Sequence, residues 1–358
     1  MALNISSFNQ HPKHLCPVYN LITFILFRKF YGVLNRRLFW KTLSINVFRS
    51  IYVICLYYCF QASKLFKTIL IDHLNNSESN RKLSNRNRNV SNKFRLRRWV
   101  FGENRKNTLV RFVAKQCIKN IGHFNNEDRN HIRNGEFWLQ NTLIKHFSKN
   151  DKIPIVFDVG ANTGEWALNL LNSGSNIQLH CFEPSEKTFT ILSEKLSSYA
   201  NVEINKFGLS KKEQIIDFFE NDSPDVTSLY KRFNAENEEK VRVRLVKGDQ
   251  YMAENKIQYI DFLKIDIEGM EYEALIGFLA NLKSNTIQAI QFEYGEFNIH
   301  SEKMLKHFYE LLTGYHIGKL YPKHIEFQDW HHDLENFKPA NIVAINRQNK
   351  ELVKLFGV

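Results

Sequence analysis

Two glycines stand where a nucleotide-binding loop would need them. Residues 156–166, VFDVGANTGEW, place Gly160 and Gly164 behind an apolar stretch that contains Asp158. Nineteen residues after Gly164, at the end of the next expected strand, comes Glu183. A glycine turn lets the backbone approach a ligand, and an acid at the second strand can accept hydrogen bonds from both ribose hydroxyls. The four positions together predict a site for an adenosine-bearing ligand.

The residues inside the loop distinguish two such ligands, NAD and S-adenosylmethionine. The dinucleotide pattern G-x-G-x-x-G anchored at Gly160 requires glycines at two positions where the chain has Asn162 and Glu165. Glu165 would bring a carboxylate to the helix start, where the pyrophosphate of NAD would bind. S-adenosylmethionine carries a sulfonium and an ammonium instead of phosphates, so Asp158 and the polar loop suit its aminoacyl end. The loop therefore favours S-adenosylmethionine as the cofactor.

Three carboxylates follow the later strands of the same pattern. Asp266 and Glu268 stand at the carboxyl end of the strand IDFLKIDI, residues 260–267, and Glu293 ends the neighbouring strand. Methyl transfer to a hydroxyl requires a group that takes the proton as the oxygen–carbon bond forms. Alternation along IDIEG predicts Asp266 and Glu268 on one side, where one could hold the cofactor and the other the substrate or act as base. These three carboxylates are the catalytic candidates.

Other interpretations of these positions stay open. Glu268 could cap a helix that begins at Met270 and pair with Lys264. The carboxylates could also bind a divalent ion, but no ligand spacing fixes such a site, so we predict no metal. His331 and His332, in the segment DWHHD, are more typical of a polar loop than of a catalytic base.

Strands and helices alternate through the part of the chain that carries these residues. Near-continuous apolar strands joined by helices predict an α/β, Rossmann-like fold with a mostly parallel sheet and helices on both faces. Two late strands, YHIGKLYP and ANIVAIN, are expected to pair antiparallel at one edge. The expected parallel strands are 153–159, 177–183, 202–209, 260–267 and 287–295, and the expected helices are 163–174, 186–199 and 270–282.

Composition divides the chain into three regions. Stretches 107–122 and 130–148 show helical spacing and are expected to cover the core. The polar stretch before them is rich in Asn, Ser and Arg, as linkers are. The predicted regions are a basic, aromatic, helical extension (1–74), a linker (75–104) and a catalytic domain (105–358) with a helical lead-in (105–150) and a Rossmann-like core (151–358).

The N-terminal part of the chain is strongly basic. Residues 1–115 carry 21 Lys and Arg against three acidic residues, whereas the remainder carries 28 basic and 34 acidic residues. Residues 50–63 are uncharged and apolar but fall short of the ~20 residues needed to cross a bilayer. Residues 20–71 suit peripheral contact with an anionic membrane surface. A helical hairpin packed on the domain or on a second subunit is an equal alternative, and nucleic acid a weaker one.

The five cysteines are scattered, without a C-x-x-C pair or a zinc-like cluster. LITFILF, residues 21–27, is short and is followed at once by Arg28 and Lys29, so no signal peptide is expected. We therefore predict a reduced, cytoplasmic location, at the inner face of the membrane if the basic extension binds there.

The motifs occur in an order that resembles FkbM-type methyltransferases over roughly residues 150–346. The K-I-D-I-E-G block is the most specific part of the resemblance, and residues 1 to about 100 lie outside it. One departure is Gly248, where the family has a threonine before Asp249. The matching segments are DVGANTG, CFEPS, the GLS of 208–210, the SL of 228–229, Asp249, FLKIDIEGMEYEAL and QFEYG.

The resemblance implies a class I methyltransferase fold that binds S-adenosylmethionine and transfers its methyl group to an oxygen. Residues 221–232 are turn-rich and resemble the variable segment of the family, and our hypothesis is that they form a lid over the acceptor, with Ser228 near the cofactor. Carried over position by position, the implied cofactor-binding residues are Asp158, Gly160, Ala161, Asn162 and Gly164 in the first motif, Glu183 and Pro184 in the second, and Leu209 and Ser210 near the adenine.

The expected function is O-methylation of a hydroxyl on a saccharide or lipid-linked glycan, with S-adenosylmethionine as methyl donor. A nucleic-acid methyltransferase is one alternative, although IDIEG replaces the Asn/Asp-Pro-Pro-aromatic turn typical of base-amino methylation. A non-catalytic binding protein on the same fold is another.

Overall fold

The computed structural model describes residues 102–358 except 175, 221–226 and 229–238. These residues belong to the second of two units into which the chain divides, Val100–Val358. The predicted membrane-contact segment 20–71, the basic extension and nearly all of the linker lie outside the described residues. Within them, no helix has the length and apolarity to cross a membrane.

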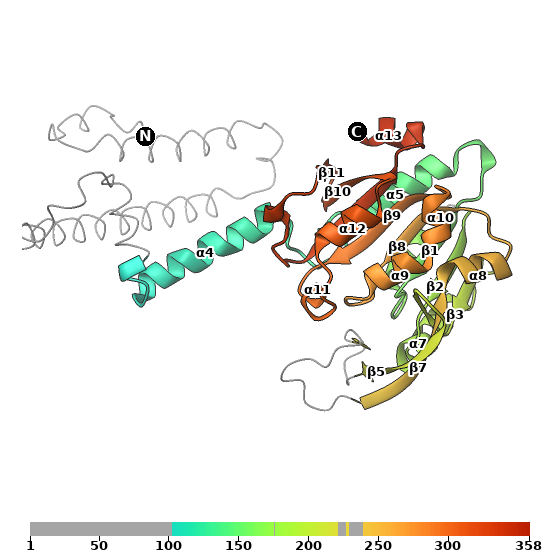
Figure 1. Ribbon diagram of the computed structural model, residues 1–358, viewed down its shortest axis with the longest axis horizontal. Coiled ribbons are helices and arrows are strands. Elements are labelled where there is room, and N and C mark those ends of the chain that lie inside the picture. Colours follow the sequence, from blue (N-terminus) through green and yellow to red (C-terminus); the bar gives the residue numbers. More distant parts are fainter. Residues whose placement is uncertain (1–101, 175, 221–226, 229–238) are drawn as a thin grey trace, which may run out of the picture. The chain divides into compact units, whose positions relative to one another are not determined.

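An eight-stranded sheet forms the centre of the domain (Figure 1). Its strand order is β11-β10-β12-β9-β8-β1-β2-β3. The parallel strands are β1 (Ile155–Val159), β2 (Gln178–Phe182), β3 (Val202–Asn205), β8 (Ile260–Ile265) and β9 (Ile287–Tyr294). The antiparallel strands are β10 (Tyr315–Tyr321), β11 (His324–Phe327) and β12 (Ala340–Asn346). The mostly parallel Rossmann-like sheet and its antiparallel edge confirm the predicted fold class.

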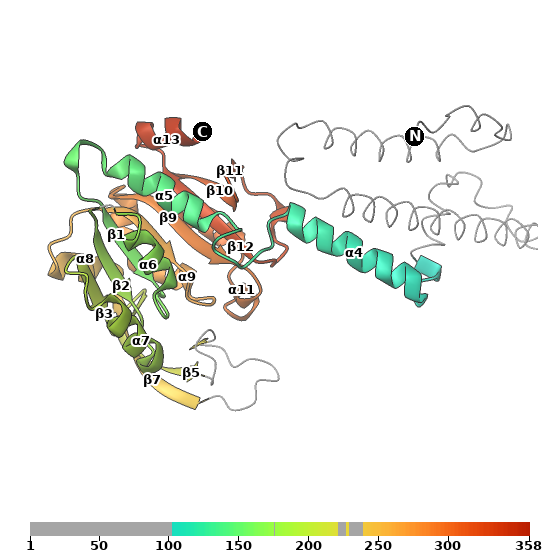
Figure 2. The same cartoon turned by 180° about the vertical axis from the view of Figure 1, so that it is seen from behind.

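Helices cover both faces of this sheet. Figure 1 shows α8 (Gly248–Glu254), α9 (Glu271–Gly277), α10 (Leu279–Lys283) and α12 (Leu305–Leu311) on one face. Figure 2 shows α5 (Glu136–Phe147), α6 (Glu165–Leu171) and α7 (Glu186–Leu196) on the other. The remaining helices are α4 (Thr108–Phe124), α11 (Phe297–His300), α13 (Lys350–Phe356) and the 3-10 turns η3 (Lys149–Asp151) and η4 (His332–Leu334).

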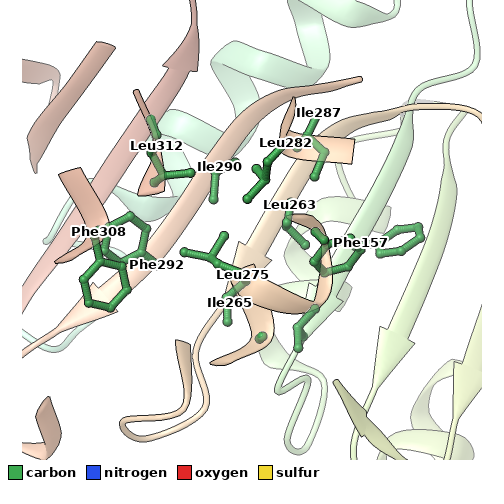
Figure 3. Close-up of a cluster of buried hydrophobic side chains, with 14 of the residues drawn as sticks. Phe157, Leu263, Ile265, Leu275, Leu282, Ile287, Ile290, Phe292, Phe308 and Leu312 are labelled. Atoms are coloured by element: carbon green, nitrogen blue, oxygen red, sulfur yellow. The ribbon is translucent and has the colours of Figure 1, made fainter. Parts of the chain in front are cut away.

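Alternation along the strands divides the core into two clusters. Leu263 and Ile265 of β8 pack with α9 and α12, whereas Phe262 packs with α5 and α6. Figure 3 shows the first cluster, in which Phe292 stacks on Phe308 at 4.6 Å between ring centroids. Each fully buried Leu or Phe contributes about 1.5–3 kcal/mol, so these two clusters hold the strand ends in place beneath the site.

A second, four-stranded sheet was not expected from the sequence. Its order is β4 (Gly208–Ser210), β7 (Glu239–Lys247), β5 (Gln214–Glu220) and β6 (Thr227–Ser228). The predicted strand 202–209 is confirmed as β3 over Val202–Asn205, but the chain then leaves the main sheet and enters the second sheet at Gly208. A Cβ at Gly208 would lie 2.7 Å from Leu245 Cδ2 on β7, so glycine leaves space for the Leu245 side chain.

Candidate functional site

A cavity of about 490 Å³ opens at the carboxyl ends of the parallel strands. The loops that follow β1, β2 and β8, together with the end of β9, supply much of its lining. In open α/β sheets this is the edge at which ligands bind. The cavity therefore lies where the sequence predicts the site.

Backbone geometry at Gly160 shapes the loop after β1. Gly160 has φ +83°, and a Cβ there would lie 2.0 Å from the carbonyl oxygen of Asp266. The N–H groups of Gly160 and Ala161 both donate to the carbonyl of Phe182, at 2.9 and 3.1 Å. Only glycine combines this conformation with this contact, so the turn brings the loop backbone against the end of β2.

Glu183 joins this loop to the loop after β2. Its carboxylate accepts the backbone N–H of Asn162 and that of Ser185, both at 2.9 Å. Burial raises the pKa of Glu183, and these backbone hydrogen bonds partly offset the effect. The residue lines the cavity, so its oxygens also stand at the position predicted for the ribose acid.

The structure brings most of the predicted cofactor residues to the cavity wall. Asp158, Gly164 and Ser210 do not line it. Gly164 is instead the N-cap of α6, with φ +83°, and a Cβ there would lie 2.8 Å from Leu192 Cδ1. The predicted residues that line the cavity are Gly160, Ala161, Asn162, Glu183, Pro184 and Leu209.

Asp158 lies beneath the cavity and pairs with Lys264 of β8. The distance from Lys264 Nζ is 3.2 Å to Asp158 Oδ1 and 3.5 Å to Asp266 Oδ2. Burial would lower the pKa of Lys264, but Asp158, Asp266 and Glu136 outweigh it and the pKa is raised. Lys264 thus stays protonated, and Asp158 acts on the cavity through it.

All three predicted catalytic carboxylates line the cavity. The strand alternation used to place two of them is wrong, because β8 ends at Ile265 and Glu268 lies in a turn with φ +55°. Burial and the charges of Asp266, Glu268 and Glu271 raise the pKa of Glu293 to about 9. Glu293 therefore carries a proton at neutral pH and offers a hydroxyl donor.

Two observations bear on the alternative interpretation of Glu268. The N-cap residue of α9, Met270, makes no side-chain cap hydrogen bond, and Lys264 pairs with Asp158 and Asp266. The carboxylate that binds the turn is Glu271, which accepts the N–H groups of Ile267 and Gly269 at 3.0 and 3.1 Å. Burial raises the pKa of Glu271 to about 7.

Two parts of the cavity wall were missed by sequence reasoning. The segment before and at the start of α5 contributes Asp128, Arg129, His131, Asn134 and Glu136. Polar residues in this lead-in carried no spacing that pointed to a site. The second sheet contributes a further wall with Ile216, Phe218 and Leu245. Its signal was present as alternation in QIIDFFE, residues 214–220.

Two buried polar atoms of the wall fit the aminoacyl end of S-adenosylmethionine. Trp166 Nε1, a donor, and Asn162 Oδ1, an acceptor, both have no hydrogen-bond partner among the described residues. A carboxylate and an ammonium would satisfy one each. Cavity carboxylates also outnumber cations, which suits a sulfonium. The acidic lining residues are Asp128, Glu136, Glu165, Glu183, Asp266, Glu268 and Glu293, against Arg129 and Lys264.

The remaining predicted positions lie elsewhere. His331 and His332 are exposed beside Asp333 and do not line the cavity. Of the proposed lid, 221–226 and 229–232 lie outside the described residues, and Thr227–Ser228 pairs with β5. Across residues 102–358, with their gaps, no group of three His, Cys, Asp or Glu side chains could hold a metal ion.

Two curated proteins match this chain in sequence. A hexuronic acid methyltransferase, AglP, of Haloferax volcanii is 25% identical over 159 residues, which cover 44% of this chain and 60% of that protein. A 2-O-methyltransferase, NoeI, of Sinorhizobium fredii is 20% identical over 188 residues, 48% of this chain and 76% of its own length. This chain thus spans less than two thirds of the AglP protein.

Solved methyltransferases align with the domain at low similarity. Precorrin-6y C5,15-methyltransferase of Geobacter metallireducens aligns with a TM-score of 0.32 and 10% identity, over 58% of this chain and 87% of that one. The family model of the methyltransferase FkbM domain matches residues 158–331. That range contains the glycine loop, Glu183, Asp266, Glu268 and Glu293. Residues 158–331 therefore match a methyltransferase domain of the FkbM family, and the cofactor of this chain is S-adenosyl-L-methionine.

Proposed function

We propose that this enzyme is an O-methyltransferase that acts on a hydroxyl group of a saccharide, free or carried on a lipid-linked glycan. The observation that carries the proposal is the group of three carboxyl side chains, Asp266, Glu268 and Glu293, on the wall of one cavity with the cofactor loop. Carboxylates accept hydrogen bonds from vicinal hydroxyls, and a protonated Glu293 can donate one. A polyol fits this site because its hydroxyls can donate hydrogen bonds to the carboxylates and accept one from Glu293.

The charge of the cavity argues against a nucleic-acid acceptor. Besides the protonated Glu293, six acidic side chains line it against two permanent cations, Arg129 and Lys264. Lys264 is occupied by Asp158 and Asp266, and Arg129 bonds Glu296 at 2.6 Å. A nucleic acid, which carries one negative charge at each phosphodiester, would meet stronger repulsion than a saccharide would. The names of the two curated relatives, a hexuronic acid methyltransferase and a 2-O-methyltransferase, support a sugar hydroxyl.

Different residues of the cavity would bind the cofactor, orient the acceptor and exclude water. S-adenosylmethionine supplies an electrophilic methyl group when it is bound. Asn162, Glu183 and Trp166 would hold it, and the carboxyl groups after β8 and β9 would orient the acceptor oxygen toward it. The second-sheet residues Ile216 and Phe218 would exclude water from the adenine side.

The test is transfer of a labelled methyl group from S-adenosylmethionine by the purified full-length protein. Methyl α-D-glucopyranoside and methyl β-D-glucopyranosiduronic acid serve as acceptors, with a short RNA and a DNA duplex beside them. We expect an O-methyl sugar, identified by its carbon chemical shift, and at least tenfold loss of turnover in Glu268→Gln. Glu194→Gln, an exposed carboxyl on α7, is the matched control. Methylation of the nucleic acids alone would overturn the proposal.

A further inference from the structure

We propose that His131 is the proton acceptor of the reaction and that Glu136 is its positioning residue. This inference rests on the proposed transfer to a hydroxyl oxygen. Both residues precede the family match at 158–331 and belong to the lead-in segment around the start of α5. The geometry that supports it is the placement of one imidazole on the wall that also carries the cofactor loop and Asp266.

Among the described residues, one ring nitrogen of the imidazole has a hydrogen-bond partner. His131 Nδ1 lies 2.9 Å from Glu136 Oε1, and the ring stacks on Phe137 at 6.1 Å between centroids. An ionised carboxylate accepts, so Nδ1 carries the hydrogen and Nε2 is left with its lone pair. Since His131 lines the cavity and Nδ1 is occupied, Nε2 is the nitrogen that can meet a bound hydroxyl.

Glu136 is fixed from several directions. Oε1 also accepts Asn134 Nδ2 at 2.7 Å and Asn341 Nδ2 at 3.1 Å, and Oε2 accepts Gln291 Nε2 at 3.0 Å. These donors come from the lead-in, from β12 and from β9. Although burial opposes ionisation, the hydrogen bond and charge of His131, with Lys264 and Asn134, bring the pKa of Glu136 down to about 2. The carboxylate is therefore charged throughout the neutral range.

The loop that carries His131 is anchored to the sheet. Asn126 Nδ2 donates to the carbonyls of Asn134 and Leu320 at 2.7 and 2.9 Å. Gly135, with φ +105°, approaches β10 so closely that a Cβ would lie 2.3 Å from the carbonyl of Tyr321. The anchoring gives the imidazole a fixed position.

Two of the carboxyl groups nearby are poorly suited to accept the proton. Asp266 Oδ2 lies 3.5 Å from Lys264 Nζ, the cation that also pairs with Asp158, and this ion pair favours the unprotonated carboxylate. Burial and neighbouring charges keep Glu293 protonated, with a pKa of about 9. Among the described residues that line the cavity, His131 is the one histidine, and histidine is the side chain that ordinarily titrates near neutral pH.

The groups that face the imidazole favour its protonated form after transfer. The hydrogen bond to Glu136 raises the pKa of His131, burial partly opposes this, Lys264 lowers it and Asp266 raises it. In the step itself, His131 Nε2 takes the hydroxyl proton while the oxygen lone pair bonds to the methyl carbon. The electron pair of the carbon–sulfur bond returns to sulfur. Glu136 then stabilises the imidazolium by charge.

The test compares His131→Ala with the exposed control His332→Ala in the labelled-transfer assay. We expect kcat to fall about 10²–10⁴-fold in the first variant alone and to recover in part with added imidazole. Calorimetry should give unchanged S-adenosylmethionine affinity. A wild-type enzyme that methylates sugars and a His131→Ala enzyme that does so within threefold would overturn this inference while the proposed function stands. An inactive wild type would instead overturn the proposed function, and this inference with it.

A second readout does not depend on turnover. The imidazole resonances of His131, identified by their loss in His131→Ala, are titrated by NMR in the wild type and in Glu136→Gln. Loss of the carboxylate charge should lower the pKa of His131 and move the acid limb of kcat to lower pH by the same amount. An unmoved acid limb beside a shifted imidazole pKa would show that another group takes the proton.

Discussion

The cavity has two halves that are held in different ways. In the cofactor half, around Gly160 and Glu183, backbone conformation and backbone N–H groups set the geometry. In the half that we assign to the acceptor, around His131, Glu136 and Glu293, side chains from several elements hold one another. Changes of backbone shape should therefore damage cofactor binding, whereas changes of charge should alter stability, pH dependence and turnover.

Lys264 joins the two halves, so its loss should have the largest effect on stability. Lys264→Met leaves Asp158 fully buried without its cation, which should cost about 3–5 kcal/mol in chemical denaturation at pH 7.5. Burial already raises the pKa of Asp158, and the lysine partly offsets it. Without the lysine the folded protein should hold a proton at Asp158, so the deficit should shrink as pH falls toward 5.

Lys240→Met, at an exposed pair with Asp217, is the control and should change stability by less than about 0.5 kcal/mol. A deficit in Lys264→Met that grows on acidification would contradict the assignment of a buried ion pair.

Gly160→Ala tests the cofactor half through its backbone. The substitution forces a left-handed residue, at about 1–2 kcal/mol, and drives a Cβ against the carbonyl of Asp266, at about 1–3 kcal/mol more. We expect loss of S-adenosylmethionine binding in calorimetry. Gly174→Ala is matched in φ, at +74°, but meets no atom within 4 Å. Gly174→Ala should therefore lose only the stability that the left-handed conformation costs, and it should bind S-adenosylmethionine normally. Equal losses of stability and of cofactor binding in both variants would show that the contact with Asp266 is irrelevant.

Glu183→Gln separates charge from shape in the same half. The amide oxygen can keep one backbone hydrogen bond, but it binds ribose hydroxyls without charge. We expect affinity for S-adenosylmethionine to fall about 10–100-fold, equivalent to about 1.5–3 kcal/mol, with little change in secondary structure. Glu186→Gln, an exposed neighbour on α7, should bind as the wild type does. Unchanged affinity in Glu183→Gln would remove the ribose assignment.

Glu293→Gln should change the free energy of unfolding least among these variants, and it should raise this free energy instead of lowering it. Because the pKa of Glu293 is raised to about 9 in the folded protein, wild-type stability is lost as pH rises from about 4 toward 9. Glutamine stays neutral in both states, so the variant should be more stable by roughly 1–3 kcal/mol at pH 8 and nearly equal at pH 4. Denaturant titrations at both pH values would measure this. A variant less stable at pH 8 would mean that the carboxylate is ionised.

The two halves also differ in how far sequence alone predicts them. The glycine loop and Glu183 could be found because consecutive strands of a parallel sheet end at one edge, so local order fixes their neighbourhood. His131 and Glu136 could not be found, because their partners Gln291 and Asn341 are more than 150 residues away in the chain. No local sequence pattern predicts which distant side-chain amide will donate a hydrogen bond to a buried carboxylate.

The order of strands in the sheet has a consequence for synthesis on the ribosome. β12 is inserted between β9 and β10, although it follows both in the chain. Until residue 346 has emerged, the edge of β9 has no partner on that side and the hairpin of β10 and β11 cannot join the sheet. Asn341, which bonds Glu136, arrives with the same strand. A nascent chain could thus form its glycine loop early, whereas the hydrogen bonds that hold Glu136 next to His131 are completed only after β12 has been translated.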